Sequence, residues 1–202
     1  MNKLRKFSLL IGLITITTVS NAQEIITRQV PVFQSLSVIG KMRVELYKSD
    51  SSRIELYTGS EPDEKIITEV KDNTLIIRLK TDTDKNAIIK IRVFYSSLTD
   101  ISVAANSLLV SSEKLVSEKI SFTARSGAKM ELDLDVKTLD ADVKQGAILV
   151  FTGLVNQQNI TVNTGATYSA YKLKAENTYV TANAGSKAKV CAARIIDATS
   201  GT

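Results

Sequence analysis

The sequence contains no histidine among its 202 residues. Without an imidazole it cannot build Ser-His-Asp or Cys-His nucleophile systems, histidine-containing zinc sites or imidazole acid–base catalysis. The same absence argues against a left-handed β-helix acyltransferase, which typically depends on histidine. The glycines recur singly and never as G-x-G-x-x-G, so a nucleotide-binding glycine loop is also absent. Composition therefore excludes several large enzyme classes.

Cysteine is limited to Cys191, so no disulfide can form within the chain. Stability must come from apolar packing and backbone hydrogen bonds. Because small and apolar residues surround Cys191 over positions 188–192, we expect a buried, unreactive thiol. An intermolecular disulfide or a reactive thiol is the alternative.

Aromatic residues make up only 5% of the chain, and after Phe151 they are Tyr168, Tyr171 and Tyr179. Tyr168 and Tyr179 alternate with core positions, so we expect packing in the core or at a corner, not an exposed platform for sugars. A set of polar residues is expected to point outward and form hydrogen-bonded ladders between coils, with a carbohydrate or ice-like lattice surface as the alternative. The set comprises Asn159, Thr161, Asn163, Thr178, Thr181 and Asn183.

No apolar run is long enough to cross a bilayer as a helix, because the longest clear one covers only residues 9–19. Basic residues precede it and Ser20, Asn21 and Ala22 follow, which is the pattern of a secretory signal peptide over residues 1–22. We therefore expect export to the periplasm, the outer-membrane surface or the extracellular space, with no transmembrane segment in the mature chain. The residue directly after the cleavage point is Gln23 and not a cysteine, so a lipid anchor is not expected.

Neither sign of charge predominates once the signal peptide and its three basic residues are removed, because the formal net charge falls from +5 to +2. Lys and Arg alternate with Asp and Glu along most of the remaining chain. A nucleic-acid-binding surface needs a basic stripe, preferably with stacking aromatic residues. We therefore expect a mixed, solvated surface and no nucleic-acid partner.

Glycine recurs at a nearly fixed spacing in the second half of the chain. The steps between Gly127, Gly146, Gly165, Gly185 and Gly201 are 19, 19, 20 and 16 residues, and Asn106 lies 21 residues before the first. A period near 20 residues is typical of stacked repeats. We expect all six positions to be structural corners that need a positive φ or a close backbone approach, which Asn tolerates better than most residues.

Two short strands follow each of the first four of these glycines. In the first copy, apolar residues alternate over 128–134 and again over 139–143. Two strands of this length cannot bury a face alone, but stacked coils can. A β-meander or sandwich is the alternative, although it favours Asn-Gly or Asp-Gly turns, and this half has none. Residues 101–202 are therefore predicted to form an all-β solenoid.

Residues 23–100 are predicted to be a β-rich N-terminal part of the same domain, so that one domain spans 28–202. Period-two patterns predict antiparallel strands within 28–58. The individual strands are expected at 30–33, 36–39, 42–47, 53–57, 74–79 and 87–95. A short helix is expected over 61–71, with Pro62 as its first residue and acidic side chains in its first turn, and an approach to a strand is the alternative.

The recurring glycines, of which the first four are followed by Ala or Ser, resemble those of the auto-transporter adhesin head domain, or GIN domain (domain of unknown function 2807). The segments Val32–Val38 and Thr68–Ile77 are similar to the opening strand and the central segment of that family. The resemblance implies a right-handed parallel β-helix in an exported protein with a role in cell-surface adhesion. It supplies no catalytic residues and no cofactor. The chain departs from the family pattern at Asn106 and at its last residues, 200–202, where the final coil is expected to lack a cap.

Acidic residues alternate on two successive strands and are the only candidates for a metal site. They are Glu131, Asp133 and Asp135, followed by Asp140 and Asp142. Such oxygens could bind Ca²⁺, or serve a polysaccharide lyase if they converged in a cleft beside Lys137 or Lys144. A solvated outer face explains the same pattern, because alternation requires outward polar residues.

The sequence thus favours an exported, non-enzymatic protein of the cell envelope that acts as an adhesin-like binding or scaffold domain. Its partner would be a surface ligand, either a glycan or a protein, and open coil ends could pair two copies. The alternative is a polysaccharide-active β-helix enzyme, or a Ca²⁺-dependent carbohydrate-binding module using the acidic residues of 131–142.

Overall fold

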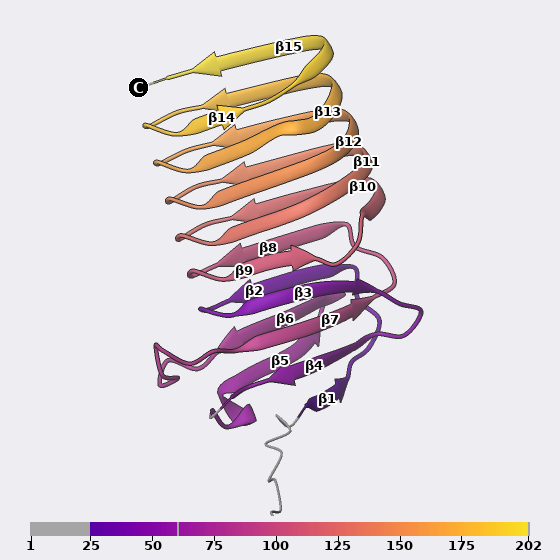
Figure 1. Cartoon of the computed structure of the whole chain (residues 1–202), viewed down its shortest axis with the longest axis vertical. Coiled ribbons are helices and arrows are strands. Elements are labelled where there is room, and N and C mark those ends of the chain that lie inside the picture. Colours follow the sequence, from indigo (N-terminus) through magenta and orange to yellow (C-terminus); the bar gives the residue numbers. More distant parts are fainter. Residues whose placement is uncertain (1–24, 60, 202) are drawn as a thin grey trace, which may run out of the picture.

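The computed structural model describes residues 25–59 and 61–201, and there the chain forms a β-solenoid (Figure 1). The coils stack one above another from the N-terminal strands to the last strand. The all-β solenoid prediction is confirmed. The expected signal peptide lies outside the described residues.

Fifteen strands and one short 3₁₀ helix, Asp63–Lys65, make up the described chain. The strands are β1 Ile26–Gln29, β2 Ser35–Ile39, β3 Arg43–Lys48, β4 Arg53–Tyr57, β5 Ile66–Lys71, β6 Thr74–Leu79, β7 Lys90–Tyr95, β8 Asp100–Ala104, β9 Leu108–Ser111, β10 Leu115–Ala124, β11 Lys129–Val143, β12 Ile148–Val162, β13 Thr167–Ala182, β14 Lys187–Lys189 and β15 Ala192–Ser200.

The sheet is curled into two faces that enclose the core. The β9 face contains β1, β4, β7, β3, β9, the first halves of β11, β12 and β13, and β14. The β10 face contains β5, β6, β2, β8, β10, the second halves of β11, β12 and β13, and β15. The three long strands, β11, β12 and β13, bend from one face to the other, so each forms most of a coil.

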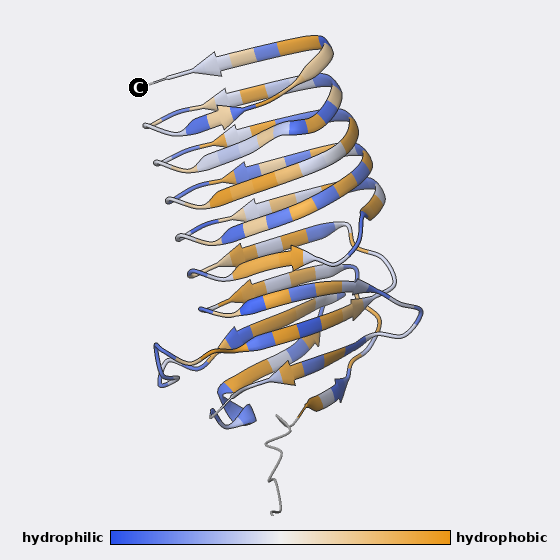
Figure 2. Ribbon diagram, in the orientation of Figure 1, coloured by the Kyte–Doolittle hydropathy of each residue, from blue (hydrophilic) through white to orange (hydrophobic). Residues whose placement is uncertain are grey.

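Parallel register aligns equivalent residues of successive coils and thereby builds the core. Met130 pairs with Leu149, and Leu149 with Tyr168, and all three side chains are fully buried. On the other face Ala141 and Ile160 form a similar buried column. Figure 2 shows the resulting alternation of hydrophobic and hydrophilic residues along the strands. Period-two alternation, repeated at one coil length, therefore places the apolar columns inside.

Tight turns return the chain from the β10 face to the β9 face. At one of them Ser126 and Gly127 both have positive φ (53° and 71°), and the Ala128 amide donates to the Arg125 carbonyl at 3.2 Å. Positive φ at both central residues is the type I′ geometry. The Gly127 amide also donates to the carbonyl of Gln145 in the next coil at 3.0 Å, so the corners are linked to one another.

Five of the six predicted corner positions occupy such turns. Gly146, Gly165 and Gly185 have φ of 70°, 68° and 69°, and Asn106 has φ of 61°. The prediction for Gly201 is wrong. Ala182 pairs with Ser200, which puts Gly201 opposite Asn183, two positions before the corner glycine of the preceding coil. The short 16-residue step in the sequence reflects this shift.

The single 20-residue step comes from a bulge in β13. The pairing shifts between Val150/Ser169 and Thr152/Lys172, so β13 has one more residue than β12 at this point. Opposite the bend, Gly153 has φ of 109°, and a Cβ there would lie 2.0 Å from the Leu134 carbonyl oxygen. Glycine is required at position 153 because the neighbouring backbone approaches so closely.

The N-terminal strands differ from the sequence prediction in three respects. Residues 61–71 form a 3₁₀ turn followed by β5, so the predicted helix is wrong. Within 28–58 only β1 and β4 are antiparallel to their neighbours, whereas β2 and β3 pair in parallel and so begin the solenoid. Residues 30–33 are not a strand, but Phe33 is fully buried in the core. In chain order, the parallel pairing of the solenoid therefore begins at β2 and β3.

The two ends of the solenoid are not alike. At the N-terminal end Arg28 spans from β1 to the opposite face, where it donates to the Ile66 carbonyl at 2.7 Å and pairs with Asp63 at 2.7 Å. At the other end every residue of β15 except Ala192 is exposed. Cys191 is exposed as well, so the prediction of a buried thiol is wrong.

Candidate functional site

A groove with a volume of about 470 Å³ crosses the coils on the β10 face. It runs over β10 and the second halves of β11, β12 and β13, and it reaches β15. Because these strands are parallel and in register, the groove follows the stacking direction of the solenoid (Figure 1).

Two columns of polar side chains line this groove. The register aligns the first column as Ser121, Asp140, Asn159, Tyr179 and Asp197. It aligns the second as Thr123, Asp142, Thr161, Thr181 and Thr199. Neighbouring strands lie about 4.8 Å apart, so each column presents one polar group at that interval. The site is therefore a regular array of carboxylate, amide and hydroxyl groups.

Neighbouring side chains fix the two central carboxylates. Asp140 accepts a hydrogen bond from the Asn159 amide nitrogen at 2.7 Å and lies 3.3 Å from the Lys119 ammonium. Asp142 pairs with Lys144 at 2.7 Å. Both carboxylates are thus held in defined orientations along the groove, although pairs this exposed add little to stability.

Two aromatic residues belong to the groove lining: Phe122 is buried, whereas 37% of the surface of Tyr179 is exposed. The expectation that it packs in the core or at a corner is wrong, whereas Tyr168 is fully buried as expected. Tyr179 pairs with Asn159, so its side chain points outward like the others in that column. An exposed aromatic face beside hydrogen-bonding groups can cover the apolar side of a ligand.

The structure separates the five carboxylates that the sequence placed together. Glu131 lies where β11 pairs with β9, Asp135 lies where β11 already pairs with Val116 of β10, and Asp133 lies between them. Of the five, only Asp140 and Asp142 reach the groove. Within 25–59 and 61–201 no group of three or more His, Cys, Asp or Glu could hold a metal ion. The geometry therefore gives no support to the calcium site.

The lysines proposed for an enzyme site do not complete one. Lys144 pairs with Asp142, but Lys137 pairs with Glu118 at 2.7 Å and does not line the groove. A lyase would need several carboxylates converging beside a basic residue. Here the two carboxylates in question follow one another along a strand, each with its own cationic neighbour.

A buried polar network lies beneath the groove, and sequence reasoning missed it. Tyr168 donates through its hydroxyl to Oε1 of Gln158 at 2.6 Å, and the Gln158 amide nitrogen donates to the Thr178 hydroxyl at 2.8 Å. Gln158 and Thr178 are both fully buried, so the expectation of an outward Thr178 is wrong. Gln158 pairs with the buried Leu139, and Thr178 pairs with Gln158, so both side chains point inward. The sequence could have indicated this only if the position of the bend in β12 were known.

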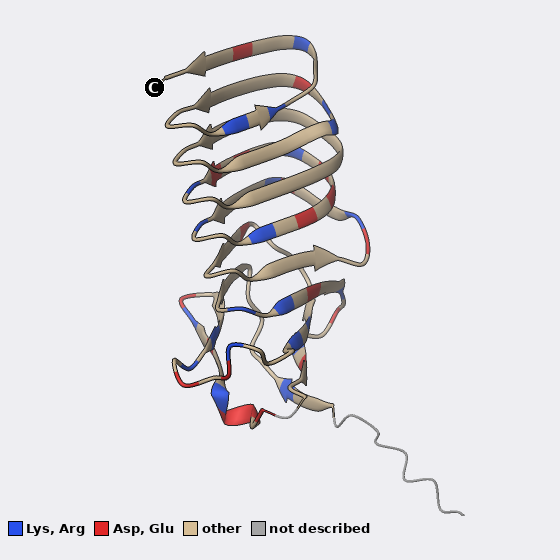
Figure 3. Cartoon of the chain, turned by 60° about the vertical axis from the view of Figure 1, so that its left-hand side comes forward, with Lys and Arg blue, Asp and Glu red and all other residues tan. Residues whose placement is uncertain are grey.

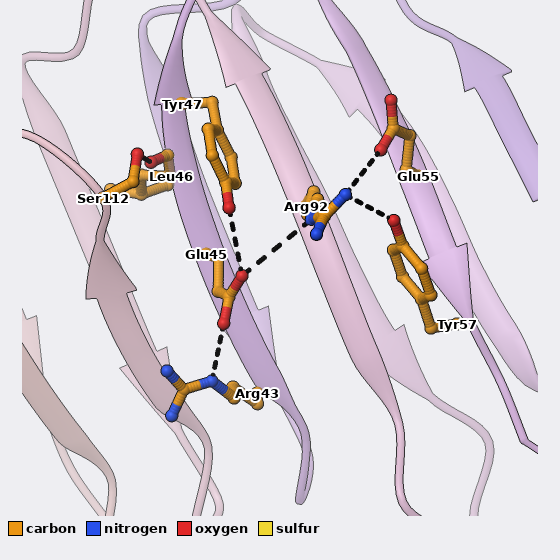
Figure 4. Close-up of polar contacts among 8 residues, drawn as sticks. All are labelled: Arg43, Glu45, Leu46, Tyr47, Glu55, Tyr57, Arg92 and Ser112. Atoms are coloured by element: carbon orange, nitrogen blue, oxygen red, sulfur yellow. Dashed lines mark hydrogen bonds and ion pairs between the residues drawn. The ribbon is translucent and has the colours of Figure 1, made fainter. Parts of the chain in front are cut away.

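A second polar cluster covers the N-terminal part of the β9 face, on β3, β7 and β4 (Figure 4). Arg92 lies at its centre, 3.6 Å from Glu55 and 3.9 Å from Glu45, and donates to the Tyr57 hydroxyl at 2.6 Å. A hydrogen bond from Arg43, at 2.8 Å, is the main cause that lowers the pKa of Glu45. The cluster therefore contains the ionised carboxylate of Glu45, which Arg43 and Arg92 flank.

Acidic and basic residues are interspersed along the ribbon in Figure 3, with neither sign gathered on one part of it. No helix in the described part of the chain has both the length and the apolar character needed to cross a membrane.

Solved structures from Bacteroides and Parabacteroides species have the same fold. A "putative adhesin" from Bacteroides fragilis has a TM-score of 0.70 at 14% identity, covering 90% of this chain and 98% of that one. A "putative adhesin" from Parabacteroides merdae has a TM-score of 0.67 at 13% identity, covering 90% and 96%. A "putative lipid binding protein" from Parabacteroides distasonis has a TM-score of 0.63 at 12% identity, covering 90% and 98%. At these identities the likeness shows the fold alone.

No curated protein matches this chain in sequence. A family model, by contrast, matches residues 32–201, from just before β2 through β15. This match includes the corner turns, both faces of the solenoid and the groove. The chain therefore belongs to the family described as "putative auto-transporter adhesin, head GIN domain".

Proposed function

We propose that this chain is an exported, non-enzymatic binding domain of the cell envelope, and that the groove on the β10 face holds an extended glycan. The observation that carries the proposal is the pair of registered polar columns along the groove. Membership of an adhesin family agrees with a binding role.

The chemistry of the groove suits a sugar chain. Carboxylate and amide groups such as Asp140 and Asn159 accept from and donate to hydroxyl groups, and the threonine column adds groups that can do both. Tyr179 offers an aromatic face for the C–H side of a sugar ring. A linear glycan lying along the stacking direction would meet an equivalent pair of polar residues at every coil.

Binding fits the groove better than catalysis does. General acid–base chemistry requires carboxyl groups placed on either side of one scissile bond. Asp140 and Asp142 instead lie two residues apart on one strand, and both side chains point outward, each beside its own lysine. This arrangement orders hydrogen-bond acceptors along a ligand.

Export is supported by the sequence pattern of residues 1–22, and an adhesin family agrees with a location outside the cytoplasm. Fractionation of cells expressing the full chain tests it, since the proposal requires the processed protein outside the cytoplasmic fraction. Pairing of two copies through their coil ends stays a prediction, which size-exclusion chromatography with light scattering can test.

A glycan array probed with the labelled protein tests the binding proposal. Asp140→Ala and Tyr179→Ala should each lower binding at least tenfold, because each removes a group that lines the groove. Tyr171→Ala is the matched control, since Tyr171 is 59% exposed but does not line the groove. Binding should also survive EDTA. Equal binding by all three variants would contradict the proposal.

A further inference from the structure

Three planar side chains form a stack across the outer surface of the β9 face. The Arg53 guanidinium lies over the Phe94 ring at 3.5 Å, and Phe94 stacks on Tyr47 with 5.2 Å between ring centres and 22° between planes. The three residues come from the adjacent strands β4, β7 and β3, at paired register positions. The stack therefore runs across the strands, in the direction of the next coil.

The stack stops at Tyr47 because the next strand supplies a small residue. Leu46 pairs with Ser111 on β9, which places Ser112 opposite Tyr47. The Ser112 hydroxyl donates to the Leu46 carbonyl at 3.0 Å and so turns toward the backbone, as Figure 4 shows. The position where a fourth planar group would continue the stack contains no bulky side chain.

A hollow of about 400 Å³ occupies this position. Tyr47 forms one wall, Val110 contributes an apolar part, and Ser112 lies opposite Tyr47. Ser111 and the charged groups Arg43, Glu45 and Glu131 complete the lining. It combines an aromatic wall with a polar rim.

The rim is ordered before any ligand binds. Tyr47 donates through its hydroxyl to Glu45 at 3.2 Å, and Arg43 donates to the same carboxylate through Nε. This leaves the terminal nitrogens of Arg43 able to donate to a ligand. Glu131 forms an ion pair with Lys129 and retains acceptor positions. Because both carboxylates have cationic neighbours, the hollow has no uncompensated charge to favour an ion.

We propose that this hollow is a second binding site that takes a single neutral sugar ring, stacked on the free face of Tyr47. The ring would add the fourth member to the row of Arg53, Phe94 and Tyr47, with Arg43 donating to its hydroxyl groups and Glu131 accepting from them. A purely aromatic ligand would leave the polar rim without partners, which costs binding energy. A sugar ring matches both the aromatic wall and the rim.

This site is independent of the groove. Its residues belong to β3, to β9 and the turn after it, and to the first half of β11, on the face opposite to Asp140 and Tyr179. A ligand in one does not require a ligand in the other.

Saturation-transfer difference NMR on the full chain tests the proposal. The probes are methyl β-D-glucopyranoside, methyl β-D-galactopyranoside and methyl N-acetyl-β-D-glucosaminide. At least one should give signals from its ring C–H protons. Ser112→Tyr, which fills the hollow and leaves Tyr47 in place, should reduce these signals at least fivefold, as should Tyr47→Ser.

Two controls separate this site from the groove and from a general loss of structure. Tyr57→Ser removes an aromatic residue from the other side of Arg92, and Tyr179→Ser alters the groove, so both should retain the signals. The proposal is overturned if none of the three pyranosides gives a signal. It is also overturned if Ser112→Tyr gives the signals of the unchanged protein, or if Tyr179→Ser alone removes them.

Discussion

The hydroxyl of Tyr168 donates a 2.6 Å hydrogen bond to Oε1 of Gln158 in the interior of the solenoid. Tyr168 comes from the half of β13 on the β9 face, and Gln158 from the half of β12 on the β10 face. Gln158 in turn donates to Thr178 in the next coil. The network therefore links the two faces and two successive coils directly under the groove.

Tyr168→Phe should destabilise the fold by about 1–3 kcal/mol, because the buried Oε1 of Gln158 loses its donor. Urea unfolding measured by circular dichroism gives the free energy of unfolding. Tyr171→Phe is the control and should leave it unchanged, since Tyr171 is exposed. Equal stability of the two variants would show that the network does not hold the faces together.

Gly153→Ala should be far more destabilising than Gly146→Ala. A Cβ at 153 would lie 2.0 Å from the backbone oxygen of Leu134, whereas a Cβ at 146 would meet no atom within 4 Å. Gly146→Ala should therefore cost only about 1–2 kcal/mol for a left-handed alanine. Thermal melts of both variants measure the difference, and a smaller loss for Gly153→Ala would refute the close approach.

Stability should fall steeply in alkali, starting near pH 10. Burial, with a smaller contribution from the charge of Glu113, raises the pKa of Tyr95 to about 12, and burial also raises the pKa of Tyr168. A tyrosine in the unfolded chain has a pKa of about 10. Between these pKa values the unfolded chain releases a proton that the folded chain keeps, so the free energy of unfolding decreases as pH rises, and the contribution is intact below pH 10.

Tyrosinate absorbance and circular dichroism, followed together from pH 8 to pH 13, measure this effect. Tyr95→Phe should make the decline above pH 10 shallower. Ionisation of all six tyrosines with an ordinary pKa and no loss of structure would be the contrary result.

Arg28→Ala should weaken the N-terminal end without affecting ligand binding. The side chain donates to the Ile66 carbonyl, the Thr68 hydroxyl and Asp63, and these contacts tie β1 to β5 across the end of the core. Their loss should raise amide hydrogen exchange in β1 and β5 at least tenfold while β12 stays protected. Arg53→Ala, on an outer surface, serves as the comparison, and uniform exchange in Arg28→Ala would contradict a local capping role.

The corners of the solenoid were predictable from sequence because each needs a left-handed residue. The single glycines at positions such as Gly127 and Gly165 therefore recur with the coil length. Gly201 follows Ser200 as Gly127 follows Ser126, but it lies two positions out of register, and sequence periodicity cannot distinguish a shifted glycine from a corner.

The polar side chains were harder to predict because the long strands bend between faces. A bend or bulge changes which residues point inward, so Thr178 is buried while Leu154 and Tyr179 are exposed. Similarly, β5 pairs with β6 although Pro62 and the acidic residues after it favour a helix start. Sheet pairing overrides that local preference. The groove depends on register between coils, which the sequence reveals only once each bend is placed.

Mapping the bound glycan by amide chemical shifts shows directly whether the groove on the β10 face is the binding site. The labelled protein would be titrated with the tightest-binding oligosaccharide of the array. If the glycan lies in the groove, the saturable shifts will be concentrated in β10, in the second halves of β11, β12 and β13, and in β15. We expect these shifts to be lost in Asp140→Ala. Saturable shifts confined to other strands, or shifts that Asp140→Ala leaves unchanged, would contradict this placement of the glycan.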